Sequence, residues 1–136
     1  MATCGARKIW DVDKLVPRFV EARRAYVGPL AKKTIQYCEK FHPGSYVILS
    51  AKYGFLLPHE KIENHDARCG VNPKITIEKL RDQAYMKKIN GIRLIDFERV
   101  IVLAGKCYCN WAYKVFGKEK VVCPLLRKGG IGLFHR

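Results

Sequence analysis

Most residues of this chain that could do chemistry follow one short apolar run. The run, Tyr46 to Leu49, is rich in β-branched and aromatic side chains and predicts a buried strand. A polar stretch from residue 50 to residue 66 comes directly after it. In an open α/β sheet, ligands bind at the carboxyl ends of the strands. The sequence therefore predicts a site between residues 50 and 66.

Several side chains of this stretch are candidates for catalysis. Lys52 could contact a phosphate or, if buried, act as an amine nucleophile. Asp66 or Glu60 could orient a water molecule or stabilise a developing positive charge. His65, like His59, could act as an acid, a base or a phosphate contact. The proposed catalytic residues are Asp66, His65, Glu60 and Lys52.

A second set of residues could hold a base or a phosphate without reacting. Tyr53 and Phe55 offer rings on which a base could stack, and Ser50 could read a base edge. Parallel strands bring their carboxyl ends to one edge, so the ends of two other expected strands should reach the same cleft. The substrate-binding candidates are Cys4, Gly5, Ser50, Ala51, Tyr53, Gly54, Phe55, Pro58, Gly105 and Lys106.

Each of these residues also has a structural explanation. Tyr53 and Phe55 could simply pack against the sheet, and Lys52 could be a solvated lysine. Asp66 could tie or cap its loop. A thiol at the position of Cys4 is more often buried and inert than nucleophilic. The sequence alone leaves these alternatives open.

The elements that must position these residues alternate along the chain. A short strand is expected near Thr3. Asp13 could cap a helix that begins at Lys14, although Pro17 requires that helix to begin close to Pro17 or to be irregular. Apolar periodicity and apolar runs predict helices over 30–41, 77–89 and 108–116, and strands over 46–50, 99–105 and 121–125. Asn90-Gly91 is expected to end the second of these helices. The order predicts a single α/β domain over residues 1–136, a three-layer sandwich with a small, mainly parallel central sheet.

The charge of the chain favours a polyanionic partner. Lys and Arg number 26 against 12 Asp and Glu, which gives a formal net charge of +14. A field of this sign attracts nucleic acid and speeds its association. A general solubility bias would give the same composition. We expect nucleic acid as the partner, with DNA favoured over RNA.

The cysteines and histidines do not show the spacing of a zinc site. We therefore expect no metal and no cofactor, and we interpret most of the six cysteines as small buried hydrophobes. No apolar run approaches the roughly 18 residues of a membrane helix, and the N-terminus lacks an apolar signal core. These features predict a cytoplasmic protein without a membrane partner.

Three motifs resemble a known family. They are Cys4-Gly5-Ala6-Arg7-Lys8, the helix start around Tyr26-Val27-Gly28-Pro29, and Val47 to Pro58 with the sequence Ser50-Ala51-Lys52-Tyr53-Gly54 at its centre. In this order they resemble the small proteins related to the YaaA peroxide-stress family. The family often has Tyr-Asp after the loop, where this chain has His65-Asp66.

The resemblance implies a fold like that of uracil-DNA glycosylases, and nucleic-acid binding or base chemistry. It also adds Lys8 to the substrate-binding candidates. The expected function is that of a DNA glycosylase-like enzyme that cleaves the N-glycosidic bond of a modified or damaged base. The alternatives are a DNA- or RNA-binding module without catalysis and a nucleotide or nucleoside hydrolase.

Overall fold

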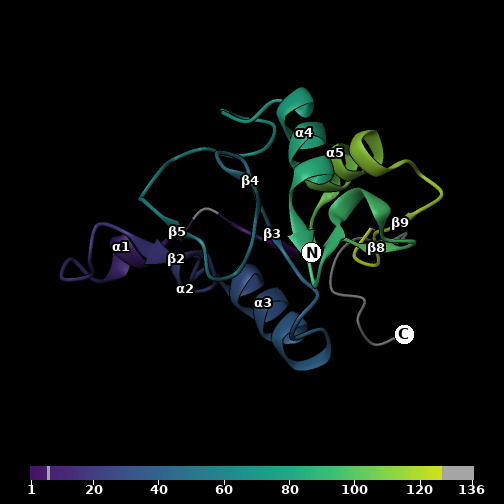
Figure 1. The fold of residues 1–136 in the computed structure, drawn as a ribbon. Helices are drawn as coiled ribbons and strands as arrows, with labels where there is room; N and C mark the ends of the chain where they lie inside the picture. Colours follow the sequence, from purple (N-terminus) through teal and green to yellow (C-terminus); the bar gives the residue numbers. More distant parts are fainter. Residues whose placement is uncertain (6, 127–136) are drawn as a thin grey trace.

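The computed structural model describes residues 1–5 and 7–126, which adopt a mixed α/β fold (Figure 1). The helices are α1 (Ile9–Val12), α2 (Ala22–Ala25), α3 (Pro29–Phe41), α4 (Ile77–Met86), η1 (Leu94–Asp96) and α5 (Lys106–Phe116). The strands are β1 (Ala2–Thr3), β2 (Val20–Glu21), β3 (Ile48–Ser50), β4 (Gly54–Leu56), β5 (Lys61–Ile62), β6 (Lys88–Ile89), β7 (Ile92–Arg93), β8 (Val100–Ile101) and β9 (Val121–Val122).

The strands that position the site lie beside the N-terminal residues of the chain. β1 pairs in parallel with β3, and β8 pairs in parallel with β9. The amide of Leu103 donates to the carbonyl of Met1 at 2.9 Å, and the amino group of Met1 donates to the carbonyl of Ile101 at 2.5 Å. These bonds bring β8 beside β1, and antiparallel β4 extends the sheet beyond β3. The carboxyl ends of β1, β3 and β8 therefore face the same edge.

Side chains alternate along these strands and build a core on each face of the sheet. One core holds Val47, Leu49, Val100 and Val102 together with residues of α4 and α5. The other holds Ala2, Ile48 and Leu103 with residues of α2 and α3. Figure 1 shows α4 and α5 on one side of β3 and α3 on the other. Helices thus cover both faces, as burial of two apolar strand faces requires.

Two predictions about local structure are wrong. No helix begins at Lys14, because Pro17 lacks an N–H and the chain turns there; α2 is a single short turn farther on. Asn90-Gly91 does not end α4, which stops at Met86. Asn90 and Gly91 both have positive φ angles, 53° and 79°, and connect β6 to β7 in a tight hairpin.

The interpretation of most cysteines as small buried hydrophobes is also wrong. Disulfides join Cys69 to Cys107 and Cys109 to Cys123, and only Cys4 and Cys38 are free among the residues that the structure describes. The partners are 38 and 14 residues apart. Local spacing does not reveal such pairs, because the fold brings them together.

One side chain of α4 fixes the turn that follows β3. The amide N–H of Phe55 donates to Oε1 of Gln83 at 2.8 Å, and Nε2 of Gln83 donates to the carbonyl of Tyr53 at 2.9 Å. Gly54 lies between them with φ +78°, and a Cβ atom at this position would collide with the Gln83 amide. Only glycine fits both the backbone and the space.

We expect Gly54→Ala to lower the free energy of unfolding by about 2–4 kcal/mol, because it strains a left-handed residue and displaces two partly buried hydrogen bonds. Gly91→Ala is the matched control. Gly91 has φ +79° but nothing within 4 Å of its Cβ position, so this change should cost about 1 kcal/mol. Urea-induced unfolding measures both variants. Equal losses would show that Gln83 does not constrain residue 54.

Candidate functional site

A row of three polar side chains, two of them buried and the third half-buried, lies at the carboxyl end of β3. Tyr26, just after α2, places its hydroxyl 3.1 Å from Oγ of Ser50 and 3.1 Å from Nε2 of His65. Ser50 is 0% exposed, and its Oγ also accepts hydrogen bonds of 3.2 Å from the N–H groups of Lys52 and Tyr53. Ser50 thus links the turn after β3 to the phenol of Tyr26.

His65 stands at the outer end of this row, on the loop after β5. Its Nδ1 lies 3.1 Å from the carbonyl oxygen of Glu63. The rings of Tyr26 and Tyr53 meet the imidazole edge-on, with centroids 5.7 and 5.1 Å away. The imidazole is therefore held by a backbone carbonyl on one side and by a phenol on the other.

Burial lowers the pKa of His65. The positive charges of Lys8 and Lys52 act in the same direction, whereas the hydrogen bond to the Glu63 carbonyl and the charge of Asp66 act against it. Desolvation is the largest of these effects. The neutral imidazole is therefore the favoured form at neutral pH.

When His65 is neutral, the number of donors and acceptors decides which imidazole nitrogen donates and which accepts. A carbonyl can only accept, so Nδ1 carries the hydrogen and Nε2 is left to accept from the Tyr26 hydroxyl. The same Tyr26 hydroxyl is placed to donate to Oγ of Ser50, which also accepts the two amide bonds. If His65 gains a proton, Nε2 becomes a donor toward the Tyr26 oxygen, and the Tyr26 hydrogen goes to Ser50. Protonation of His65 therefore changes which partner receives the hydrogen of Tyr26.

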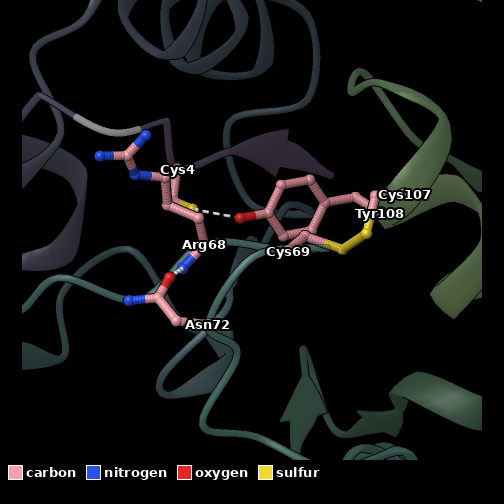
Figure 2. The surroundings of a disulfide bond; sticks show 6 residues. All are labelled: Cys4, Arg68, Cys69, Asn72, Cys107 and Tyr108. Atoms are coloured by element: carbon pink, nitrogen blue, oxygen red, sulfur yellow. Dashed lines mark hydrogen bonds between the residues drawn. A yellow bond between two sulfur atoms is a disulfide. The ribbon is translucent and has the colours of Figure 1, made fainter.

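A second phenol lies near the end of β1. Sγ of Cys4, which is buried, is 3.0 Å from the hydroxyl of Tyr108 on α5 (Figure 2). Burial raises the pKa of Tyr108 and of Tyr26, and the proximity of Cys4 adds to both effects. Both phenols therefore stay protonated at neutral pH. Lys8, only 3% exposed, lies close enough to His65 to affect its titration.

The other candidates at the turn serve the backbone or the core. Phe55 is fully buried, and its ring centroid lies 5.5 Å from that of Phe116. The carbonyl of Ala51 accepts from the amides of Lys74 and Ile75 at 2.8 and 3.0 Å. Nζ of Lys52 lies 5.2 Å from the centroid of the Tyr53 ring. The hydroxyl of Tyr53 points toward the backbone of Glu63.

The two carboxylate candidates lie outside the hydrogen-bonded cluster. Glu60 accepts from Nζ of Lys87 at 2.7 Å and from the amide of Leu57 at 2.7 Å, so it stabilises the end of β4. The side chain of Asp66 is 81% exposed, and Nε of Arg68 is 3.9 Å from its Oδ1. Of these two carboxylate residues, Asp66 is the one that lies near His65.

The remaining candidates are divided between the two ends of the sheet. Gly105 caps α5 and Lys106 is its exposed first residue, both at the same edge as Cys4 and Ser50. Gly5 has φ +70°, which suits the turn after β1. Pro58 instead lines a groove of about 560 Å³ at the opposite edge, together with Tyr46, Arg23 and Asn90 among others.

The structure therefore brings together Cys4, Lys8, Ser50, Tyr53 and His65, with Lys52 and Asp66 at the surface beside them. Sequence reasoning did not include Tyr26 and Tyr108 in the site. Tyr26 was noticed only as part of a helix start, and Tyr108 only as the beginning of a helix. One signal could have identified both residues. Each is a tyrosine that lies just before, or at, the first residue of an element expected at this edge of the sheet.

Within residues 1–5 and 7–126, no group of three or more His, Cys, Asp or Glu side chains is placed to hold a metal ion. No helix in the same residues is long and apolar enough to cross a membrane.

The lowered pKa of His65 predicts a pH dependence of stability. Unfolded histidine takes up a proton near its ordinary pKa of 6.5, whereas folded His65 resists protonation until lower pH. The contribution of His65 to the free energy of unfolding is thus fully present above pH 6.5 and falls as the pH drops toward the folded pKa. We expect His65→Gln to flatten the decline of the melting temperature between pH 7 and pH 5. His42→Gln, a change of an exposed histidine, should leave it unchanged; parallel curves for all three proteins would contradict the assignment.

Comparison with known proteins gives a family but no activity. Residues 12–132 match the model of a family described as "Family of unknown function (DUF6884)". The "Uncharacterized protein YfjM" of Bacillus subtilis (strain 168) is 35% identical over 133 residues, which cover 95% of this chain and 84% of that protein. No solved structure matches the chain. The matched residues span most of the described fold, and the chain belongs to the DUF6884 family.

Proposed function

We propose that this protein binds nucleic acid and cleaves the N-glycosidic bond of a modified or damaged base. The observation that carries the proposal is the hydrogen-bonded row of Tyr26, Ser50 and His65 at the carboxyl end of β3, in which Tyr26 and Ser50 are buried. Burial of polar side chains costs free energy unless each hydroxyl has hydrogen-bond partners. A row of this kind is therefore expected to have a function. Its titratable end, His65, is the part that reaches the surface.

The surface residues around His65 give each step of this chemistry a candidate. The ring of Tyr53 would stack on an extruded base, and Lys52 would contact the adjoining phosphate. Asp66 would orient water or stabilise the cationic sugar as the bond to the base breaks. His65 would exchange the proton, with Tyr26 and Ser50 adjusting their hydrogen bonds behind it.

The charge and the layer arrangement support the same proposal. A formal charge of +14 favours a polyanion over a free nucleoside. Helices on both faces of a small, largely parallel sheet are compatible with a three-layer sandwich like that of uracil-DNA glycosylases. We extend the proposal to a YaaA-related ancestry, to DNA over RNA and to a cytoplasmic location.

One observation favours a second candidate, a nucleic-acid-binding module without catalysis. Glu60 is engaged by Lys87, and Asp66 points to solvent, so neither carboxylate is held in the buried cluster. Many glycosidic-bond enzymes depend on a positioned carboxylate. A hydrolase of free nucleosides is the least favoured alternative, because it has no need of the basic charge.

A panel of oligonucleotides with modified bases separates these candidates. The protein is incubated with single-stranded and duplex forms, and alkali then cleaves the strand wherever a base has been released. Strand cleavage with a defined base supports the enzyme. Binding that weakens steeply with salt, but with no abasic sites, supports the module. Absence of salt-dependent binding would contradict both.

For a substrate that is cleaved, we expect His65→Gln to reduce base release by about 100-fold, the usual scale for a lost acid or base. Asp66→Asn should reduce it by about 10-fold or more, as loss of charge stabilisation predicts. His42→Gln, on the exposed end of α3, is the matched control and should stay within about twofold of the original rate. Undiminished base release by Asp66→Asn would remove Asp66 from the mechanism.

A further inference from the structure

We propose that the Cys69–Cys107 disulfide is a redox-active bond whose opening releases the loop of residues 66–73 beside the candidate site. This loop, called here the cysteine loop, follows His65 directly and ends before α4. The bridge joins it to the first turn of α5, with the two Cα atoms 5.9 Å apart. The proposal is independent of the reaction that the site performs.

The hydrogen bonds of the cysteine loop are mainly internal. The amide of Arg68 donates to Oδ1 of Asn72 at 2.9 Å, and Nδ2 of Asn72 donates to the carbonyl of Asp66 at 2.5 Å. The amide of Val71 donates to the carbonyl of Arg68 at 3.2 Å. These bonds give the loop its own shape but do not attach it to the sheet.

Within residues 66–73, the contacts of the cysteine loop with the rest of the fold gather near the bridge, and the chain just after the loop is held by the amides of Lys74 and Ile75 on the carbonyl of Ala51. Figure 2 shows Tyr108 between Cys4 and the disulfide, with its hydroxyl 3.0 Å from Sγ of Cys4. Ala67 is buried nearby. The disulfide is the covalent tie among these contacts, so its reduction should loosen residues 66–73 before other parts of the fold.

The position of Cys107 favours its release as a thiolate. It is the second residue of an 11-residue helix whose first turn contains no acidic side chain. Exposed helix N–H groups stabilise a thiolate there, and Lys106 adds a positive charge next to it. Because a stabilised thiolate is the better leaving group, this end of the bridge should open readily. The other ionisable groups around the bridge are Tyr108 on α5, Cys4 after β1, and Arg68 and Asp66 on the loop.

The second disulfide provides an internal comparison. Cys109 is 0% exposed and belongs to the core between the sheet and α5, and its partner Cys123 is partly exposed, whereas both cysteines of the first bridge are partly exposed. Gly70 is exposed beside the first bridge, and a Cβ atom at that position would come within 3.5 Å of Sγ of Cys107. The glycine therefore leaves the Cys69–Cys107 bridge open to a small thiol.

The proposed step is an exchange with a dithiol reductant. One reductant thiolate attacks Sγ of Cys69, the bond to Cys107 breaks, and Cys107 leaves as a thiolate. The second reductant thiol then attacks the mixed disulfide, which releases Cys69 and closes the oxidised reductant. Two electrons and two protons pass from the dithiol to the cysteine pair, so the exchange balances.

The test follows both bridges during titration with dithiothreitol, using alkylation and peptide mass spectrometry. We expect Cys69–Cys107 to open about 10-fold faster than Cys109–Cys123, and at a reduction potential at least about 30 mV higher, which is a tenfold difference in equilibrium constant. Hydrogen exchange should rise in residues 66–73 at the first transition. A protein isolated in air with four free thiols at these positions, or opening of both bridges together, would overturn the proposal.

Two variants test the reason for the difference. Lys106→Gln should slow opening of Cys69–Cys107 and lower its reduction potential, because it removes charge beside the departing thiolate. Lys118→Gln, an equally exposed lysine beyond the other end of α5, should change neither. Cys109→Ser/Cys123→Ser keeps the first bridge alone, so its opening can be measured even if the two transitions overlap. Equal effects of the two lysine changes would contradict a local role of the helix start.

Discussion

The rest of the site depends on the buried hydroxyl of Ser50. It stands at the last residue of β3, where it accepts the amides of Lys52 and Tyr53 and pairs with the phenol of Tyr26. Loss of a buried partner costs about 1–3 kcal/mol, so these groups hold one another in place. The strand end, the turn after it and the segment after α2 are thereby fixed together. His65 needs this arrangement, because it binds to the outer side of the same phenol.

The sequence predicts the parts of the fold that local patterns control. Apolar runs mark β3 and the start of the predicted strand over 99–105, of which only β8 is a strand, and helical spacing marks α3, α4 and α5, because each buries one side of a regular element. It does not predict β4, since a turn that contains Gly54 and leads back along β3 resembles a loop. Its geometry is set by Gln83, 28 residues beyond Phe55.

The site could be predicted in part for the same reason. Ser50, Tyr53 and His65 lie in one continuous polar stretch, and Cys4 follows a strand expected at the same edge. Tyr26 and Tyr108 join them through contacts across 24 and 104 residues. The Cys69–Cys107 bridge likewise spans 38 residues. Partners at such separations are decided by the packing of α2 and α5 against the sheet, which no short sequence pattern contains.

The burial of the cluster limits how any ligand can use it. Tyr26 and Ser50 are closed off, so a ligand can reach the row only through the half-exposed His65 and its neighbours Lys52 and Tyr53. His65 is also the residue that immediately precedes the cysteine loop, which the Cys69–Cys107 bridge ties covalently to α5. Movement of that loop must therefore change the backbone next to His65 before it changes Tyr26 or Ser50. Under the proposed redox switch, opening of the bridge would reach the site through this short piece of chain, whatever the ligand is.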